Sequence, residues 1–380
     1  MIFADHAATT PVRREALEAM WPYLTGAFGN PSSRHGVGEE AARALAWARD
    51  EVAAVVGCRA GDVVFTSGGT EADNLAVTGL ALANQRGRHV VVSPVEHEAV
   101  LESAGALRRL HGFEVDPVEV DETGAVAPEA LARVIRPDTT LVSVQLANNE
   151  VGTVNPVAEL AAIAHASGAL LHTDAVQAAG WLPLAIDDLG VDALSLAGHK
   201  VGAPKGTGAL VVRGRLPLEP VLHGGGQERG RRSGTENVAG AVAFATALRL
   251  AEAERADAAA RVGAVASRFR ALVAASVPRA VPTGHPSRRL PGTVSYVFPG
   301  TSGEAVLLEL ERRDVIVSSG SACAAGSDEP SHVLTAMGFA PGVAQTAVRF
   351  SFGSEATDAD AATAAGALAD AVSAVRDIVP

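Results

Sequence analysis

The sequence predicts an α/β protein, with a large domain built on a mostly parallel sheet flanked by helices and a smaller α+β domain at the C-terminal end. The first observation is an alternation of apolar, β-branched runs with helical stretches between about residues 50 and 213. The second is an alanine-rich, helix-favouring segment at 237–278, which indicates a link into a second unit. The third is the length, because 380 residues can form a large domain and a smaller one.

Short apolar runs mark the expected strands of the large domain. They lie at 63–66, 89–93, 141–146, 169–173, 192–196 and 208–213. Helical stretches separate several of these runs, at 71–86, 97–111, 128–135 and 157–167. Because strand, helix and strand follow one another, the sheet should be mostly parallel, and ligands should bind beyond the carboxyl ends of its strands.

The C-terminal part should form the smaller α+β domain. Its expected strands lie near 292–298 and 346–352, and its expected helices at 303–312, 330–337 and 357–377. We therefore predict a large domain at 15–250 and a small domain formed by 1–14 together with 251–380.

The composition narrows the classes of function. A formal net charge of −12 opposes binding to nucleic acid or to an anionic membrane, so neither is predicted as a direct partner. The N-terminus carries Asp5 and lacks the apolar core of a signal peptide, and no long uncharged apolar run indicates a transmembrane helix. Two cysteines without CxxC spacing predict neither a disulfide framework nor a metal site. The expected location is the cytoplasm, where a free thiol can persist.

Lysine is rare in this chain. Only Lys200 and Lys205 occur among 31 Lys and Arg residues, and both lie in "AGHKVGAPKGTGAL". Arginine supplies charge equally well, but a neutral amine that can form a Schiff base requires lysine. One of these lysines is therefore a candidate for chemistry, and the alternative is a packing or surface position without a chemical role.

The two cysteines have different surroundings. Cys323 lies in "VSSGSACAAGS", where its neighbours are almost all Ser, Gly or Ala, whereas a structural cysteine is usually buried among apolar residues. This setting makes Cys323 a candidate for a chemical role, and the alternative is a small structural residue. Cys58, in "VVGCRAGDVVF", lies between a helical segment and a strand, where a small packing residue would serve.

Two strand ends carry residues suited to a cofactor. "FTSGGTEADN" follows a strand and opens a helix, so that Gly69 and Thr70 could bind a phosphate; the alternative is an ordinary glycine turn. Asp174 follows an apolar strand and could keep a pyridine nitrogen protonated; the alternative is a helix cap.

Three further side chains complete the pattern. His97 could stack on a flat ring or move protons, and Asn149 could orient a ring hydroxyl. Arg349 is charged within an apolar strand, so it should bind either a substrate carboxylate bidentately or an internal acidic partner. Together with a deprotonatable lysine, these residues favour a pyridoxal 5'-phosphate site that acts on an amino acid.

At this point the sequence resembles a known family. It is similar to the cysteine desulfurases of the NifS and IscS kind, which are pyridoxal-phosphate enzymes of fold type I in the class V aminotransferase family. The resemblance runs from "DHAATTPV" to "VRFSFG" and rests on "SGGTEADNLAV", "NNEVGTV", "DAVQAAG", "SLAGHKVGAPKGTGALVVR", "HGGGQERGRRSGTEN" and "SSGSACAAGSDEPSHVLTAMG".

The resemblance implies a role for each matching residue. The cofactor would be attached to Lys200, with Asp174 at its ring nitrogen, Gln177 at its ring oxygen, His97 stacked on the ring, and phosphate contacts from Gly69, Thr70 and His199. Asn149 would contact both cofactor and substrate, Arg349 would bind the substrate carboxylate, and Cys323 would take the sulfur. Thr235 would reach the phosphate of a neighbouring subunit, which implies a homodimer. Ala197 replaces the serine usual in the family, so one phosphate hydroxyl ligand should be missing and cofactor retention weaker.

The expected function is that of an L-cysteine desulfurase, which yields L-alanine and a persulfide on Cys323. The sulfur would pass to an acceptor protein for iron–sulfur cluster assembly, tRNA thiolation or another sulfur pathway. The alternatives are a related pyridoxal-phosphate aminotransferase, a selenocysteine lyase, or a non-catalytic sulfur-relay scaffold.

Overall fold

The computed structural model describes residues 1–319 and 329–376, and its largest feature is a seven-stranded sheet. The strand order is β2-β8-β7-β6-β5-β3-β4. The strands are β2 (Val63–Thr66), β3 (His89–Val92), β4 (Glu114–Pro117), β5 (Thr139–Ser143), β6 (Leu170–Asp174), β7 (Ala193–Ala197) and β8 (Gly208–Val212).

The sheet is mostly parallel, as the sequence predicts. Neighbours from β7 to β4 pair in parallel, and β8 runs antiparallel to both β7 and β2. The parallel strands therefore end at one edge, and β6 delivers Asp174 there while β7 ends at Ala197. That edge is where α/β sheets of this kind bind their ligands.

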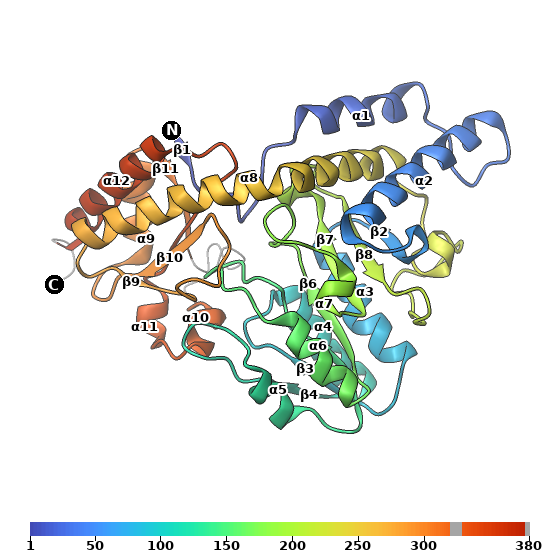
Figure 1. The fold of residues 1–380 in the computed structure, drawn as a ribbon, viewed down its shortest axis with the longest axis horizontal. Coiled ribbons are helices and arrows are strands. Elements are labelled where there is room, and N and C mark those ends of the chain that lie inside the picture. Colours follow the sequence, from blue (N-terminus) through green and yellow to red (C-terminus); the bar gives the residue numbers. More distant parts are fainter. Residues whose placement is uncertain (320–328, 377–380) are drawn as a thin grey trace.

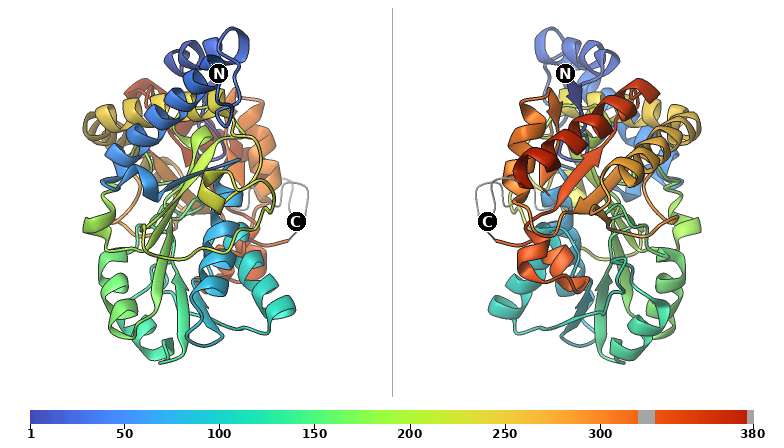
Figure 2. Two further views of the ribbon diagram at one scale, coloured as in Figure 1. Left: turned by 90° about the vertical axis from the view of Figure 1, so that its right-hand side faces the viewer. Right: turned by 90° about the vertical axis from the view of Figure 1, so that its left-hand side faces the viewer.

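Helices cover both faces of this sheet (Figure 2). They are α2 (Gly36–Val56), α3 (Gly69–Ala83), α4 (Glu98–His111), α5 (Pro128–Val134), α6 (Val157–Ala166) and the short α7 (Ile186–Leu189). Two separate hydrophobic clusters result, one containing Leu75 and Leu107 and the other Leu160 and Leu171. Burial of apolar side chains on both faces accounts for the continuous apolar character of the strands.

A single long helix, α8 (Val238–Ser276), runs along both parts of the molecule (Figure 1). Asn237 caps its first turn by accepting a hydrogen bond from the main-chain N–H of Gly240. Phe244 packs in the core under the large sheet, and Phe269 packs in the core of the smaller part. The helix is therefore the link that the sequence predicts at 237–278.

The smaller part is built on a four-stranded antiparallel sheet in the order β12-β13-β10-β9. Its strands are β9 (Val281–Pro282), β10 (Thr293–Val297), β12 (Ser318–Ser319) and β13 (Val348–Ser351). Its helices are α9 (Gly303–Glu311), α10 (His332–Ala336), α11 (Pro341–Ala344) and α12 (Asp358–Arg376). Phe269, Tyr296, Phe350 and Phe352 form the aromatic centre of its core.

The N-terminus belongs to this smaller part in space. β1 (Ile2–Phe3) pairs in parallel with β11 (Val315–Ile316), and Figure 1 shows it beside α12. The chain then crosses to the large part and forms α1 (Arg14–Thr25). The division into 15–250 and 1–14 with 251–380 stays a prediction, which this pairing supports.

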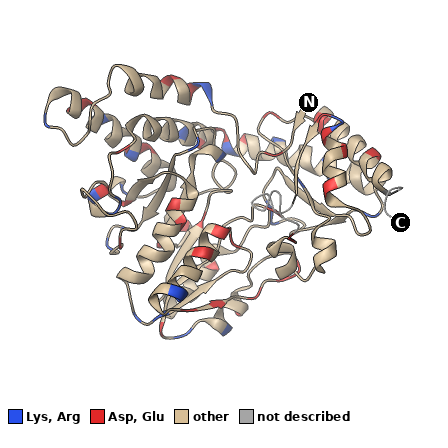
Figure 3. Cartoon of the chain, turned by 180° about the vertical axis from the view of Figure 1, so that it is seen from behind, with Lys and Arg blue, Asp and Glu red and all other residues tan. Residues whose placement is uncertain are grey.

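Acidic and basic residues are interspersed over both parts of the described chain (Figure 3). None of the described helices has the length and apolar character needed to cross a membrane.

Candidate active site

One cavity of about 290 Å³ lies at the carboxyl ends of the central strands and contains most of the predicted site residues. They come from separate segments of the chain, which the fold brings together. The predicted residues that line it are Gly69, Thr70, His97, Asn149, Asp174, Gln177, His199, Lys200 and Arg349.

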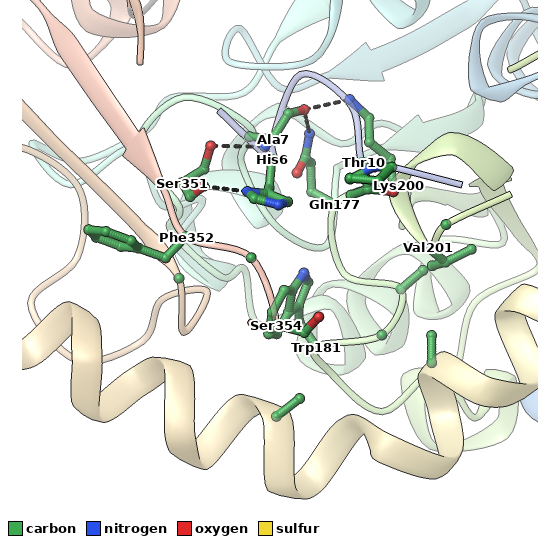
Figure 4. Close-up of a pocket in the computed structure, with 18 of the residues that line it drawn as sticks. His6, Ala7, Thr10, Gln177, Trp181, Lys200, Val201, Ser351, Phe352 and Ser354 are labelled. Carbon is green, nitrogen blue, oxygen red and sulfur yellow. Dashed lines mark hydrogen bonds between the residues drawn. The ribbon is translucent and has the colours of Figure 1, made fainter. Parts of the chain in front are cut away.

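Lys200 lies in a 3-10 turn (Gly198–Lys200) directly after β7. A side chain at Gly198 would place its Cβ 2.2 Å from the hydroxyl of Thr207, so the tight turn requires glycine there. The Lys200 amine donates a hydrogen bond to the main-chain oxygen of Ala7 (Figure 4). It donates a second one, of 2.9 Å, to the main-chain oxygen of Ala8. Lys205, by contrast, is exposed. Only Lys200 therefore points into the cavity region.

Gln177 approaches the same segment. Its Nε2 donates a 2.9 Å hydrogen bond to the oxygen of Ala7, which also accepts from Lys200 (Figure 4). The N-terminal segment thus forms one wall of the cavity. Sequence reasoning missed Ala7, because a main-chain oxygen leaves no signal in the sequence.

Asp174 is a buried carboxyl group at the end of β6. Its Oδ1 accepts a 2.8 Å hydrogen bond from the main-chain N–H of Val176. Burial raises the pKa of Asp174, while the nearby charges of His97 and Lys200 act in the opposite direction. A cationic ring nitrogen in this cavity would compensate for the cost of burying the carboxylate.

Two further buried carboxyl groups, Asp73 and Glu96, lie near Asp174. Burial raises the pKa of both groups, and the charge of Asp174 raises each of them further. Asp73 lines the cavity, and its Oδ1 has no hydrogen-bond partner among the described residues. Sequence reasoning did not assign it a role. The available signal was helical spacing, because Asp73 follows Gly69 by one turn of α3.

The start of α3 lines the cavity with Gly69 and Thr70, the two residues predicted to bind a phosphate. The helix begins at Gly69, where an added Cβ would lie 2.9 Å from a methyl group of Val176 and 3.4 Å from the Cβ of Ala197. Gly68 adopts φ +154° and ψ −177°, a conformation that other residues rarely reach. Glycines therefore leave room beside the exposed Thr70 and the free N–H groups of the first turn.

His199 is suited to donate a hydrogen bond to an anion. Burial, followed by the charges of Lys200 and Lys205, lowers the pKa of His199 to about 4. Its Nδ1 lies 3.2 Å from the hydroxyl of Thr9, which fixes the ring. A neutral imidazole at this position keeps one N–H donor at physiological pH.

His97 is the N-cap of α4. Its Nδ1 accepts a 3.1 Å hydrogen bond from the main-chain N–H of Ala99. In the neutral ring, the proton therefore resides on Nε2. This hydrogen bond orients the imidazole at the edge of the cavity, which His97 lines.

Arg349 forms the internal salt bridge that the sequence leaves open as one of two alternatives. It lies in β13 with 1% of its surface exposed and forms an internal ion pair with Asp5, 2.8 Å between Nη2 and Oδ1. Nη1 donates to the main-chain oxygen of Asn149 at 2.9 Å. Arg349 also lines the cavity, and its Nε has no hydrogen-bond partner among the described residues. The internal salt bridge is therefore real, and donors remain for a ligand.

The structure does not bring Thr235 into this cavity. It lines a different hollow of about 220 Å³, together with Arg232 and Glu228. Cys323 lies outside the described residues. Cys58 is half-buried against the large core, and burial raises the pKa of its thiol to about 12, so it is a poor nucleophile near neutral pH.

This set of groups fits pyridoxal 5'-phosphate. The fit rests on an amine for covalent attachment, a buried carboxyl group for a cationic nitrogen, and a helix N-terminus with glycines for a phosphate. The unpartnered Nε of Arg349 marks a place for a further anion, such as the carboxylate of an amino acid.

A sheet of this order with a lysine at the end of β7 defines a pyridoxal-phosphate enzyme of fold type I, and the comparisons agree. The model of the family "Aminotransferase class-V" matches residues 2–363, and the chain belongs to this family. The predicted cofactor dependence is thereby confirmed. The chain is 41% identical over its whole length to a cysteine desulfurase IscS of Dictyoglomus turgidum, 96% of which is covered.

Solved structures show the same similarity. A NifS-like protein superimposes with a TM-score of 0.91 at 35% identity, covering 98% of this chain and 99% of that one. A second structure, SspA in complex with cysteine, has a TM-score of 0.80 at 34% identity and covers 93% and 99% of the two chains. The predicted fold class and the predicted resemblance to cysteine desulfurases are both confirmed.

Proposed function

We propose that this protein is an L-cysteine desulfurase, which converts L-cysteine to L-alanine and transfers the sulfur to Cys323 as a persulfide. The observation that carries the proposal is the convergence of Lys200, Asp174 and Arg349 on one cavity. The similarity to proteins named cysteine desulfurase over the whole chain supports the same reaction. The reaction balances, because the carbon–sulfur bond of the substrate breaks while its sulfur bonds to the sulfur of Cys323, and the carbon keeps the electron pair and gains a proton.

Pyridoxal 5'-phosphate, when bound, supplies an electron-withdrawing ring that makes the carbon–sulfur bond of an attached amino acid easier to break. We assign its attachment to Lys200 and its ring nitrogen to Asp174. The N–H groups at Gly69 and Thr70, with His199, would hold the phosphate. Gln177 would contact the ring oxygen, and Asn149 would contact both the cofactor and the substrate.

Arg349 would bind the substrate carboxylate, and His97 would move protons through Nε2. The buried position of Arg349 excludes water and strengthens its attraction for an anion. The amine of Lys200 lies against the carbonyls of Ala7 and Ala8, which hold it at the cavity wall and can orient a proton on Nζ.

The assignment of Cys323 as sulfur acceptor rests on the sequence and on the described residues around it. Ser318 of β12 pairs directly with Arg349 in β13. On the other side, Ser331 caps α10 and donates to the buried carboxyl of Glu150, the neighbour of Asn149. Both described flanks of 320–328 therefore lie beside proposed substrate-binding residues.

We further propose that the protein works as a homodimer, in which Thr235 reaches the cofactor phosphate of the other subunit. Thr235 is exposed and lies in a hollow separate from Lys200. Large apolar side chains are exposed on and after α1, with Trp21 at 65% and Phe28 at 72%. Such surfaces are typical of protein interfaces. The acceptor protein, its pathway and the cytoplasmic location stay predictions from the sequence.

The test is incubation of the pyridoxal-phosphate-loaded protein with L-cysteine and a thiol reductant, with alanine and sulfide measured together. A desulfurase gives both in equal amounts. An aminotransferase would give a keto acid, a selenocysteine lyase would give alanine from selenocysteine alone, and a scaffold would give neither product. Any of those three results would contradict the proposal.

A further inference from the structure

The N-terminal segment at 5–10 contacts several proposed site residues. Ala7 accepts hydrogen bonds from Lys200 and Gln177, as Figure 4 shows, and the hydroxyl of Thr9 lies 3.2 Å from His199. Ala7, Gln177 and Lys200 line both the cofactor cavity and a neighbouring cavity of about 270 Å³. Its charged residue, Asp5, faces Arg349.

The guanidinium of Arg349 is held at two points. Nη1 donates to the main-chain oxygen of Asn149 at 2.9 Å, and Nη2 donates to Oδ1 of Asp5 at 2.8 Å. Because Arg349 is 1% exposed, solvent cannot stabilise its charge, and Asp5 supplies the counter-charge.

These two contacts leave donors for a ligand. A guanidinium has five N–H groups, so three remain after the bonds to Asn149 and Asp5, including the Nε that has no partner among the described residues. Asp5 bonds through one oxygen only, and therefore does not occupy a whole fork of the guanidinium. A substrate carboxylate can thus form two parallel hydrogen bonds while Asp5 stays in place.

Asp5 is itself fixed by the strand that carries Arg349. Its main chain forms a parallel bridge with Ser351, and the next residue, His6, donates its N–H to the oxygen of Ser351 at 3.1 Å. The hydroxyl of Ser351 accepts from the N–H of Ala7 at 2.9 Å. Because Asp5 is tied to β13, the strand that carries Arg349, its carboxylate and the oxygen of Asn149 together fix the orientation of the guanidinium.

We propose that Asp5 is a positioning residue, which holds the guanidinium of Arg349 in the orientation that binds the α-carboxylate of the amino-acid substrate. This inference rests on the proposed function, in which Arg349 binds that carboxylate. Asp5 acts through Arg349 and needs no contact with the substrate.

The test compares two ligands that differ only in a carboxylate, L-alanine and ethylamine. Each is titrated into the pyridoxal-phosphate-loaded protein, and the dissociation constant is read from the change in visible absorption. Asp5→Asn should weaken alanine binding by about tenfold, because the carboxylate then meets a guanidinium free to tilt. Ethylamine binding should stay unchanged. Both dissociation constants are measured on the same protein sample, so a smaller folded fraction does not alter their ratio.

Two controls make the result specific. Asp360→Asn removes a half-buried carboxylate that hydrogen-bonds Thr357 at the start of α12, and it should change neither constant. In a protein that already carries Arg349→Gln, Asp5→Asn should cause no further loss of alanine affinity. Three results for Asp5→Asn would overturn the proposal. They are equal weakening of alanine and ethylamine binding, unchanged alanine binding, and tighter alanine binding, which is expected if Asp5 competes with the substrate. Sulfide release from L-cysteine by the wild-type protein, measured in parallel, tests the proposed function separately.

Discussion

The amine of Lys200 donates a 2.9 Å hydrogen bond to the main-chain oxygen of Ala8, which precedes it in the chain by 192 residues. The segment that holds this lysine also holds Gln177, through Ala7. The lysine is therefore placed by tertiary structure as well as by the turn that follows β7. This placement distinguishes it from Lys205, which is exposed.

Lys200→Ala should abolish covalent retention of pyridoxal phosphate, because no other amine is placed at the cavity by the described residues. The measurement is the visible absorption band after extensive dialysis. Lys205→Ala is the matched control and should keep the band, since Lys205 does not line the cavity. A band of normal intensity in Lys200→Ala would refute the assignment.

Ala197→Ser should slow the loss of cofactor during dialysis. Ala197 is buried in the cavity wall, and its Cβ is 3.4 Å from the Cβ position built on Gly69 at the start of α3. A serine hydroxyl there can reach the proposed phosphate position, and a hydrogen bond to a charged group contributes about 1.5–3 kcal/mol. Retention should increase roughly tenfold.

The control for this variant is Ala164→Ser, a serine at a buried position of α6 outside the cavity. It should leave cofactor retention at the wild-type level. Faster loss from Ala197→Ser than from the wild-type protein would show that the hydroxyl does not meet the phosphate.

The fold was predictable to a large extent, because apolar strands and helices alternate strongly in the sequence. Each expected element of the described chain is present within a few residues, for example 89–93 as β3 (His89–Val92). β4 (Glu114–Pro117) was not expected. It is an edge strand that carries two acidic residues and a proline, so it lacks the apolar pattern that marks a central strand. The antiparallel direction of β8 was also not predictable, since the direction of a strand within a sheet leaves no signal in its local sequence.

The site was predictable where its residues lie in local motifs at strand ends, as Asp174 and Lys200 do. The role of Asp5 was not, because its partner Arg349 lies 344 residues away and only the fold brings them together. The position of Asp73 near the site could have been predicted, since helical spacing places it one turn after Gly69.

Glu150→Gln should raise the stability of the protein at pH 8 and change it little at pH 5. Burial raises the pKa of Glu150 to about 7, while Ser331, Arg349 and Glu98 modify this shift less. The protonated carboxyl therefore stabilises the fold fully below the pKa of an unfolded glutamate, and this contribution is lost as the pH rises through about 7. Glutamine stays neutral and avoids a loss of up to about 3 kcal/mol.

The measurement is the apparent melting temperature of both proteins between pH 5 and pH 8. The difference between variant and wild type should grow with pH. A difference that stays constant, or that shrinks as the pH rises, would show that Glu150 is already ionised in the folded protein at low pH.

Cys323→Ser should separate two stages of the reaction. Binding of cysteine depends in our proposal on Lys200, His97 and Arg349, none of which is altered, so addition of cysteine should still change the visible spectrum. Release of alanine and sulfide should stop, because a serine hydroxyl is a far poorer nucleophile than a thiolate and cannot hold a persulfide.

Cys58→Ser is the matched control, because it removes the other thiol of the chain. Burial raises the pKa of Cys58 to about 12, and the residue packs against the large core without lining the cavity. Its replacement should therefore leave both the spectral change and product formation intact, with at most a small loss of stability. Two results would show that Cys323 is not the sulfur acceptor. One is alanine production at the wild-type rate by Cys323→Ser, and the other is loss of activity in a folded Cys58→Ser protein.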